Sequence, residues 1–534
     1  MGERLRGGES TVAVVGSGVA AITVAYLLTR KGHDVVLFEK GPDYPYPHAR
    51  QFEERVNYLY INPAYQLAPD IRRVTWSGDY RQDLDHERGM VVGGSATHWL
   101  GIALRMHPTD FKTRTAYGFG YDWPITYEDL EPYYCKAESL LSVSGTDADN
   151  PFAPPRTHPY PLPPFDLTPS DRVLAARLQK ADITLHTTPQ ARTRLPHDGR
   201  PACQNFGTCG VCPIGARYSP NHHLARAQAT GLCRVIPNAS VRRIITDRTG
   251  RAVAVLYRNN ETTTDLEHAA KVVVVAAGAI ESARLLLLST DAQNPNVLGK
   301  QTAYVGKNLV FHHLWHASLR YREKVHAGRL GAVTGQCHQF CDVPERGRHG
   351  GIKVEFSSHY AGLGHGILEQ RSAARETSGG GMIETFSSRP YLRGLILHAE
   401  SAPSSNKYVG LSEKRDRFGD PFAHVHYESA TFDEATYSFA KRLCERFAMA
   451  TNGEIDDLEK MNQYSSGAHH MGSCRMGRSD RESVVDSFGK LHGCPNLYLV
   501  GSSVFAGSSG AVNPTLTLVA LAIRTSEHIL ARVL

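Results

Sequence analysis

The chain has 534 residues, of which 41% are hydrophobic and 21% are charged, and its formal net charge is +6. This is the composition of a globular protein with ample length for a large core. It has no basic run or arginine-rich arm, so we expect no nucleic-acid partner. Its apolar runs are shorter than the roughly 18 residues of a membrane span, so we expect no integral membrane segment.

The N-terminal stretch has no apolar core of the kind that a conventional secretory signal carries before its cleavage site. We therefore expect a cytoplasmic location, or export while bound to a partner that carries a signal. The ten cysteines are scattered, apart from one cluster near residue 210. In a cytosolic chain, clustered cysteines more often indicate metal or redox chemistry than a disulfide framework.

The first forty residues predict a strand–turn–helix–strand unit. Residues 12–15 are apolar and β-branched, which is typical of a buried parallel strand. A glycine-rich turn follows, and residues 20–30 then have helical spacing. Residues 35–38 form a second apolar run that ends at Glu39. Such a βαβ unit is the entry segment of a doubly wound α/β domain.

The turn of this unit carries a dinucleotide-binding pattern. Gly16 and Gly18 let the backbone approach a pyrophosphate at the helix N-terminus, and Ala21 permits close helix packing. Glu39 can accept hydrogen bonds from a ribose. The alternative, a glycine-rich turn in an unrelated α/β fold, leaves the acid after the second strand unexplained.

Further elements of the nucleotide domain come from the middle and the end of the chain. Residues 271–289 and 496–507 each read as a buried strand that runs into a turn, and a strong helical pattern follows residue 513. The intervening segments therefore form a second domain that the chain enters more than once. Residues 150–169 are rich in proline and predict an extended surface connection, and residues 361–382 predict a mobile loop.

Six blocks in chain order resemble the glucose–methanol–choline (GMC) oxidoreductase family, whose members are flavoproteins. The blocks beyond the N-terminal βαβ unit are "VVGGSATHW", "YGFGYDWPITYEDLEPYYCKAE", "VVVAAGAIESARLLLLS", "VGKNL", "HHMGSCRMG" and "NPTLT". The resemblance is greatest to two sugar-oxidising branches, the FAD-dependent glucose dehydrogenase catalytic subunit and pyranose oxidase. It implies FAD as the cofactor and a GMC fold, in which a Rossmann-like domain is interleaved with an α+β substrate domain.

The resemblance implies an FAD-binding domain from residues 1–105, 220–310 and 470–534, with residues 106–219 and 311–469 forming the substrate-binding cap. Beyond the dinucleotide pattern, it assigns contacts with the cofactor to further residues. These are Gly93, Gly94, Ser95, His98, Val241, Gly501, Ser502, Asn513 and Thr515.

His98 follows the flexible Gly93-Gly94 turn directly and precedes Trp99. In pyranose oxidases a histidine in a similar Thr-His-Trp context is bonded covalently to the flavin. In the glucose dehydrogenase branch a His-Trp pair stands in the same place, and a bond is not implied there. We expect His98 to contact the flavin, with or without a covalent link.

The segment that begins at His469 carries the expected catalytic base. Oxidation of a carbinol needs a base for the hydroxyl proton, and a neutral imidazole suits this role. The family spacing selects His469, and its neighbour His470 is expected to point away. Asn513, before the C-terminal helix, is the expected partner that holds the substrate oxygen. Phe311-His312 stands where the family often has Asp-His, so no role carries over to His312 or His313, and we expect both to be structural.

Cys203, Cys209 and Cys212 form a C-x5-C-x2-C cluster before Pro-Ile-Gly-Ala. In the glucose dehydrogenase branch three cysteines before a similar run hold a three-iron [3Fe-4S] cluster, and thiolates are the ligands that iron–sulfur clusters use. The last gap here is two residues and not three, which departs from that pattern. The alternative is a buried cysteine loop without metal.

These features predict FAD-dependent oxidation of a hydroxyl on a sugar, glycoside or related polyol. The expected acceptor is not oxygen but a small partner subunit or a cytochrome. One alternative is an oxygen-using oxidase of the pyranose or glycoside type that acts on a glycosylated natural product. The other is a flavin-binding module without catalysis. The segments around 311–400 are expected to determine substrate specificity.

Overall fold

The computed structural model describes residues 5–47, 71, 73–79, 88–205, 209–290, 303–325, 333–357, 387–457 and 468–534. The expected loop at 361–382 lies outside these residues. The α-helices of the described part are α1 (Val19–Thr29), α5 (Thr113–Tyr117), α6 (Tyr127–Leu141), α7 (Pro169–Gln179), α8 (Asn221–Gln228), α9 (Gly278–Ser289), α12 (Thr431–Thr451) and α13 (Thr515–Arg532).

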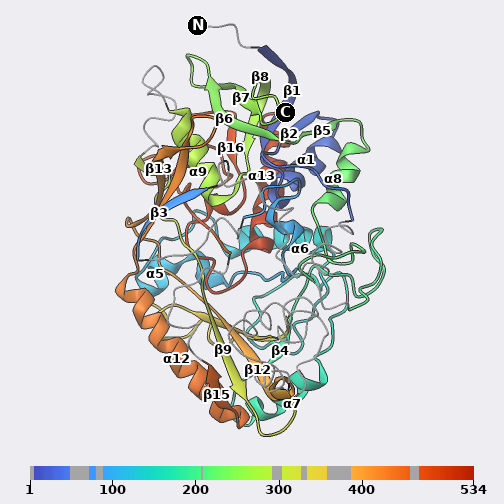
Figure 1. The fold of residues 1–534 in the computed structure, drawn as a ribbon, viewed down its shortest axis with the longest axis vertical. Coiled ribbons are helices and arrows are strands. Elements are labelled where there is room, and N and C mark those ends of the chain that lie inside the picture. The colour runs from blue at the N-terminus through green and yellow to red at the C-terminus, as the bar shows by residue number, and fades with distance from the viewer. Residues whose placement is uncertain are drawn as a thin grey trace, which may run out of the picture.

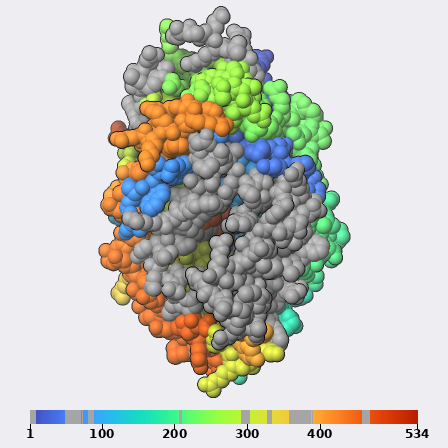
Figure 2. All heavy atoms as spheres, viewed as in Figure 1, coloured from blue at the N-terminus to red at the C-terminus, as the bar shows by residue number. Residues whose placement is uncertain are grey.

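A seven-stranded sheet forms the upper half of the molecule (Figure 1). Strands β5, β2, β1, β8 and β16 run parallel, and β7 and β6 continue the sheet antiparallel beyond β8. In this order the bounds are β5 (Cys233–Ile236), β2 (Val35–Phe38), β1 (Leu5–Val15), β8 (Asp265–Val275), β16 (Leu497–Leu499), β7 (Ala252–Asn259) and β6 (Ala239–Thr246). The sheet therefore draws on the start, the middle and the end of the chain. Figure 2 shows the blue N-terminal segment and green segments from the middle of the chain side by side in this upper part of the molecule.

The parallel strands pack on both faces, which explains their continuous apolar runs. Val12 and Val272 are neighbours across β1 and β8, and both are fully buried. Helix α1 packs against the sheet and against α13, and nine of its eleven residues are buried. Burial of one such apolar side chain stabilises the fold by about 1.5–3 kcal/mol. This core holds the turn between β1 and α1 in place.

A six-stranded antiparallel sheet forms the lower half. Its strands in spatial order are β15 (Glu454–Asp457), β9 (His313–Arg320), β12 (Leu392–Ala399), β11 (Ile352–Ser357), β10 (Val333–Cys337) and β4 (His186–Thr187). One face packs on α12 and α7 through Trp315, Val354 and Leu397. Because side chains alternate along a strand, the residues between these point to the other face. That face looks toward the seven-stranded sheet, and Lys353 and His398 lie side by side on it.

A three-stranded sheet joins the two halves, with the order β13 (Lys407–Arg415), β14 (Pro421–Tyr427) and β3 (Val74–Gly78).

Within the described residues, the proline-rich segment from 150 to 168 contains no helix or regular strand, as an extended connection requires. The helices of the described part include none with the length and apolar character that crossing a bilayer needs. The short 3-10 helices are η2 (Gly94–Thr97), η3 (Pro108–Phe111), η6 (Arg389–Tyr391) and η8 (Ser502–Val504).

Candidate active site

A cavity of about 610 Å³ extends from the turn after β1 to the polar face of the six-stranded sheet. Gly16, Gly18 and Glu39 line one end, and His469 and Asn513 line the other. Small-molecule and cofactor sites have volumes of about 300–1,000 Å³. The cavity thus connects the expected nucleotide-binding turn with the expected catalytic residues.

The turn after β1 gives a ligand close access to the backbone. Gly16 has a φ of +96°, and a Cβ there would lie 2.7 Å from the carbonyl oxygen of Ala276. A side chain is therefore excluded at Gly16. At Gly18, in contrast, a Cβ would meet no protein atom within 4 Å. The open space beside Gly18 lies at the N-terminus of α1, where an anionic group is stabilised by free N–H groups and by the helix dipole.

Glu39 lies at the end of β2 and is almost fully buried. Its Oε2 accepts hydrogen bonds from the amide (3.1 Å) and the hydroxyl (2.6 Å) of Ser17. Its Oε1 accepts a hydrogen bond from the amide of Gly41. Burial raises the pKa of the Glu39 carboxyl to about 7, although the bonds from Ser17 and Gly41 oppose this shift. The carboxyl group lines the cavity, where it can accept a hydrogen bond from a hydroxyl group of a ligand.

The glycine pair before His98 packs against the glycine-rich turn between β1 and α1. Gly94 begins the 3-10 helix η2, and a Cβ at this position would lie 2.9 Å from the Cα of Gly18. Ser95 and His98 line the cavity at the end of this segment. The indole of Trp99 donates a hydrogen bond to the carbonyl of Tyr218 (2.8 Å). The turn therefore carries His98 to the cavity wall, and Trp99 anchors the chain behind it.

Most of the other residues that the sequence assigns to the cofactor also line the cavity. Two do not line it: Ala21, a residue of α1, is fully buried in the core, and Gly93 packs against the side chains of Asn221 and Thr97. Both serve packing and not direct contact. The remaining members that line the cavity are Val241, Gly501, Ser502 and Thr515. The open backbone at Gly18, the carboxylate at the strand end and the elongated cavity fit FAD.

His469 and Asn513 meet at the other end of the cavity. Nε2 of His469 lies 3.3 Å from the amide nitrogen Nδ2 of Asn513. Asn513 directly precedes Pro514 and α13, which places its amide at the N-terminus of that helix. His470, expected to point away, also lines the cavity and packs edge-on against Phe311. The structure brings the predicted base and its predicted partner together.

His312 lies against His469, which the sequence did not indicate. The two Nδ1 atoms are 2.9 Å apart. The Nε2 atom of His312 lies 2.6 Å from the carbonyl oxygen of Ser508 and 2.8 Å from that of Gly510. His312 precedes β9 and is fully buried. The contact between the two Nδ1 atoms links His312 to the predicted base. His313 agrees with the expectation of a structural role, because it is bonded to the buried carboxylate of Asp433 (3.1 Å).

A buried ion pair lies on the other side of Asn513. The ammonium of Lys353 donates hydrogen bonds to Oδ1 of Asn513 and to Oε1 of Glu355. The ring of His398 stacks on that of His469 at 5.5 Å, and its Nε2 lies 3.3 Å from Oε1 of Glu355. Burial opposes the charge of Glu355, but Lys353 and His398 hold the pKa of its carboxyl well below its usual range.

The same surroundings make His469 a neutral imidazole. Burial lowers its pKa well below the usual histidine range, and the neighbouring His312, His398 and Lys353 add to this effect. Burial likewise lowers the pKa of His312 to about 3. A histidine that is neutral near pH 7 has a free lone pair, which is what a general base requires.

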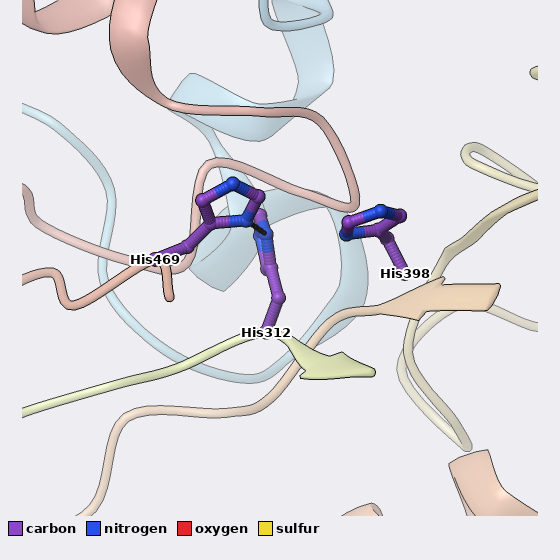
Figure 3. Close-up of side chains that lie close together, drawn as sticks. All are labelled: His312, His398 and His469. Atoms are coloured by element: carbon purple, nitrogen blue, oxygen red, sulfur yellow. Dashed lines mark hydrogen bonds between the residues drawn. The ribbon is translucent and has the colours of Figure 1, made fainter. Parts of the chain in front are cut away.

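His312, His398 and His469 each offer a ring nitrogen within 4.8 Å of the others, and Figure 3 shows the three rings gathered at one point. Imidazoles are ligands for several divalent transition metals. The 2.9 Å separation between His312 and His469, however, is that of an N–H···N hydrogen bond. We therefore interpret this cluster as a hydrogen-bonded network.

The three clustered cysteines lie away from the cavity wall. Cys209 is buried, Cys203 and Cys212 are half-buried, and all ten cysteines of the chain are free thiols. Arg192 directs its guanidinium toward the sulfur of Cys209 (3.8 Å). Burial raises the pKa of the Cys203 thiol, whereas Arg192 opposes the shift. Thiols are the donors that iron–sulfur clusters use, but among the described residues these three sulfur atoms do not form a group close enough together to share a single metal ion.

Sequence comparison matches this chain with known families and proteins. Models described as GMC oxidoreductase match residues 186–314 and 403–522, and one described as an NAD(P)-binding Rossmann-like domain matches residues 14–55. The fructose dehydrogenase large subunit of Gluconobacter japonicus is 28% identical, over 98% of both chains. The 2-methyl-1,2-propanediol dehydrogenase of Mycolicibacterium austroafricanum is 29% identical, over 98% of this chain and 96% of that one. The 6'''-hydroxyparomomycin C oxidase of Streptomyces lividus is 29% identical, over 97% and 91%.

Solved structures share the fold. Formate oxidase superposes with a TM-score of 0.69 at 14% identity, over 100% of this chain and 99% of that one. Pyridoxine 4-oxidase from Mesorbium loti superposes with a TM-score of 0.65 at 16% identity, over 98% and 99%. Together with the matched family models, the Rossmann-like sheet and the cavity, these likenesses lead to one conclusion. The chain belongs to the GMC oxidoreductase family, and it is an FAD-dependent oxidoreductase that acts on CH–OH groups.

Proposed function

We propose that the chain oxidises a hydroxyl group of a sugar, glycoside or related polyol to a carbonyl and passes the electrons to an acceptor other than oxygen. The observation that carries this proposal is the pairing of His469 with Asn513, 3.3 Å apart, at the end of the cofactor cavity. Relatives named as acting on fructose and on a hydroxyparomomycin support a polyhydroxylated substrate.

In the proposed reaction, Nε2 of His469 accepts the proton of the substrate hydroxyl. The amide N–H of Asn513 donates a hydrogen bond to the same oxygen and stabilises the negative charge that develops on it. Bound FAD supplies the acceptor for the hydride that leaves carbon. Both residues stay uncharged before the reaction, so a neutral hydroxyl can approach without the desolvation of an ion.

The walls near His469 favour a polar substrate. His316, Glu355 and His398 project from neighbouring strands of the six-stranded sheet and line this end of the cavity. Several donors and acceptors at fixed positions suit a molecule with several hydroxyl groups. This sheet lies between residues 313 and 399, apart from its edge strands, within the region expected to determine specificity.

His98 is proposed to contact the flavin, with a covalent link as one of two outcomes. Denaturation with acid followed by filtration distinguishes them. Flavin that stays with the protein, and is released from the His98→Ala variant, establishes the link. Flavin that passes the filter from the wild-type protein excludes the link and leaves a contact.

We propose Cys203, Cys209 and Cys212 as ligands of an iron–sulfur cluster. Their free thiols and the contact of Arg192 with Cys209 support this assignment, and the large-subunit relative supports a partner subunit that receives the electrons. Iron and acid-labile sulfide are measured on protein purified without oxygen. About three irons per chain, lost in the Cys209→Ser variant, support the cluster, and flavin without iron refutes it.

The experiment that tests the proposed function is a substrate panel. FAD-loaded enzyme is mixed without oxygen with hexoses, pentoses, polyols, glycosides and simple alcohols, and bleaching of the visible flavin band is followed. We expect the sugars or polyols to bleach the flavin faster than simple alcohols. Reoxidation is then compared between oxygen, with peroxide measured, and an artificial electron acceptor. Fast reoxidation by oxygen would establish the oxidase alternative, and a preference for simple alcohols would refute the substrate class.

A further inference from the structure

The hydrogen bonds around His469 form one chain, and both of its ends have fixed polarity. At one end, backbone carbonyls of Ser508 and Gly510 can only accept hydrogen bonds. The Nε2 atom of His312, within 2.8 Å of both, must therefore carry a hydrogen. His312 is neutral near pH 7 because burial lowers its pKa to about 3. Its Nδ1 atom is then a lone-pair acceptor.

This acceptor determines the tautomer of His469. The two Nδ1 atoms lie 2.9 Å apart, so one hydrogen lies between them. Because Nδ1 of His312 accepts, Nδ1 of His469 must donate. In a neutral imidazole only one nitrogen carries a hydrogen. Nε2 of His469, the atom that lines the substrate end of the cavity beside Asn513, therefore holds the lone pair.

The other end of the chain leads to the same direction. The ammonium of Lys353 can only donate, so the atom of Asn513 that it contacts is the amide oxygen. Glu355 fixes this ammonium through a buried ion pair, in which the side chains of both residues are at most 2% exposed. The amide nitrogen of Asn513 is thus turned toward Nε2 of His469. All four links donate in one direction, from Lys353 to the backbone carbonyls.

We propose that His312 is a positioning residue that keeps His469 in the tautomer with its lone pair on Nε2, and that Lys353 orients the Asn513 amide from the opposite side. This inference rests on the proposed role of His469 as the base. Figure 3 shows how the ring of His312 meets that of His469 edge-on. Without the acceptor on His312, the hydrogen of His469 is free to move to Nε2, where it blocks proton abstraction.

Two substitutions at one position test the inference. His312→Leu fills the site but offers no acceptor. His312→Gln restores one, because its carbonyl oxygen accepts from His469 and its amide donates to the Ser508 carbonyl. The readouts are flavin content, the substrate dissociation constant and the limiting rate constant of anaerobic flavin reduction. We expect His312→Leu to lower that rate constant at least about tenfold, with the dissociation constant unchanged, and His312→Gln to stay within about threefold of the wild type.

Two results overturn the inference: a wild-type rate constant in His312→Leu, or a His312→Gln variant as slow as His312→Leu. Should the leucine variant fail to fold, 15N NMR of the histidine rings in the wild-type holoenzyme answers the same question. The inference requires a protonated Nδ1 and an unprotonated Nε2 on His469, and the reverse pattern refutes it. His469→Ala separates the two proposals. A normal rate in His469→Ala refutes the proposed base, whereas a slow His469→Ala with a normal His312→Leu refutes only the positioning role.

Discussion

Removal of Lys353 should destabilise the protein strongly, because it leaves the Glu355 carboxylate buried without the cation that balances its charge. Lys353 is 0% exposed and Glu355 is 1% exposed, and their charges compensate each other beside Asn513. Breaking a buried ion pair on one side costs about 3–5 kcal/mol, whereas replacing both partners is often close to neutral. Unfolding of a domain changes the entropy by about 2.1 cal/mol/K per residue. When this entropy is summed over 534 residues, the lost stability of about 3–5 kcal/mol lowers the melting temperature by about 3–5 °C.

The assay is thermal unfolding of the FAD-loaded protein, followed through the release of flavin fluorescence. The variants are Lys353→Met, Glu355→Gln and the double variant, which contains neither charge. We expect both single variants to melt at a lower temperature, and the double variant to recover most of the loss. A Lys353→Met protein that melts with the wild type refutes the reasoning. The reasoning is also refuted if the melting temperature of the double variant falls by the sum of the decreases in the two single variants.

Three further results follow from the geometry. Gly18→Ala should keep the stability of the apoprotein but bind FAD more weakly in a fluorescence titration. Gly16→Ala should lower stability by about 1–3 kcal/mol, because its Cβ would contact Ala276. Equal losses of stability in the two variants would contradict this prediction. Because the pKa of His312 falls from 6.5 to about 3 on folding, the unfolded chain binds more protons between these values. The contribution of neutral His312 to stability is therefore complete above pH 6.5, and it is lost toward pH 3 by up to about 1.4 kcal/mol per pH unit. The free energy of unfolding in urea should thus fall less steeply with acid in His312→Gln than in the wild type. Parallel plots of this free energy against pH for the two proteins would contradict the shift. Since the pKa of His469 lies well below the usual histidine range, the rate constant of flavin reduction should stay level as the pH falls through 6.5, and a loss of activity at that pH would count against a depressed pKa.

Local patterns in the sequence were sufficient for the nucleotide half of the molecule. The apolar runs at 12–15 and 35–38 are buried strands, and the structure extends the first of them into the longer β1. These signals are readable because a strand buried on both faces is continuously apolar, and because a turn that approaches a cofactor needs glycine at fixed positions. The pairing of His469 with Asn513 rested on the family resemblance and not on spacing, since 44 residues separate them.

The network behind the base could not be predicted in the same way. In β11, the alternation of Ile352, Lys353, Val354 and Glu355 indicates a strand with one polar face. Such a face is read as solvent-exposed, whereas here it closes a cavity and is buried. Which strands pair, and in what register, depends on contacts between distant segments. His312 gave no local signal at all, because its partners Ser508 and Gly510 lie almost two hundred residues later.

The most direct test of the central claim is the rate constant of anaerobic flavin reduction by a sugar or polyol in the wild type and in His469→Ala. Both proteins are compared at equal flavin content, so that cofactor binding does not enter the comparison. The account predicts that the wild type is bleached rapidly and that His469→Ala is slower by about 10²–10⁴-fold, the usual contribution of a general base. Bleaching of His469→Ala at the wild-type rate would contradict the assignment of the base and, with it, the positioning role proposed for His312.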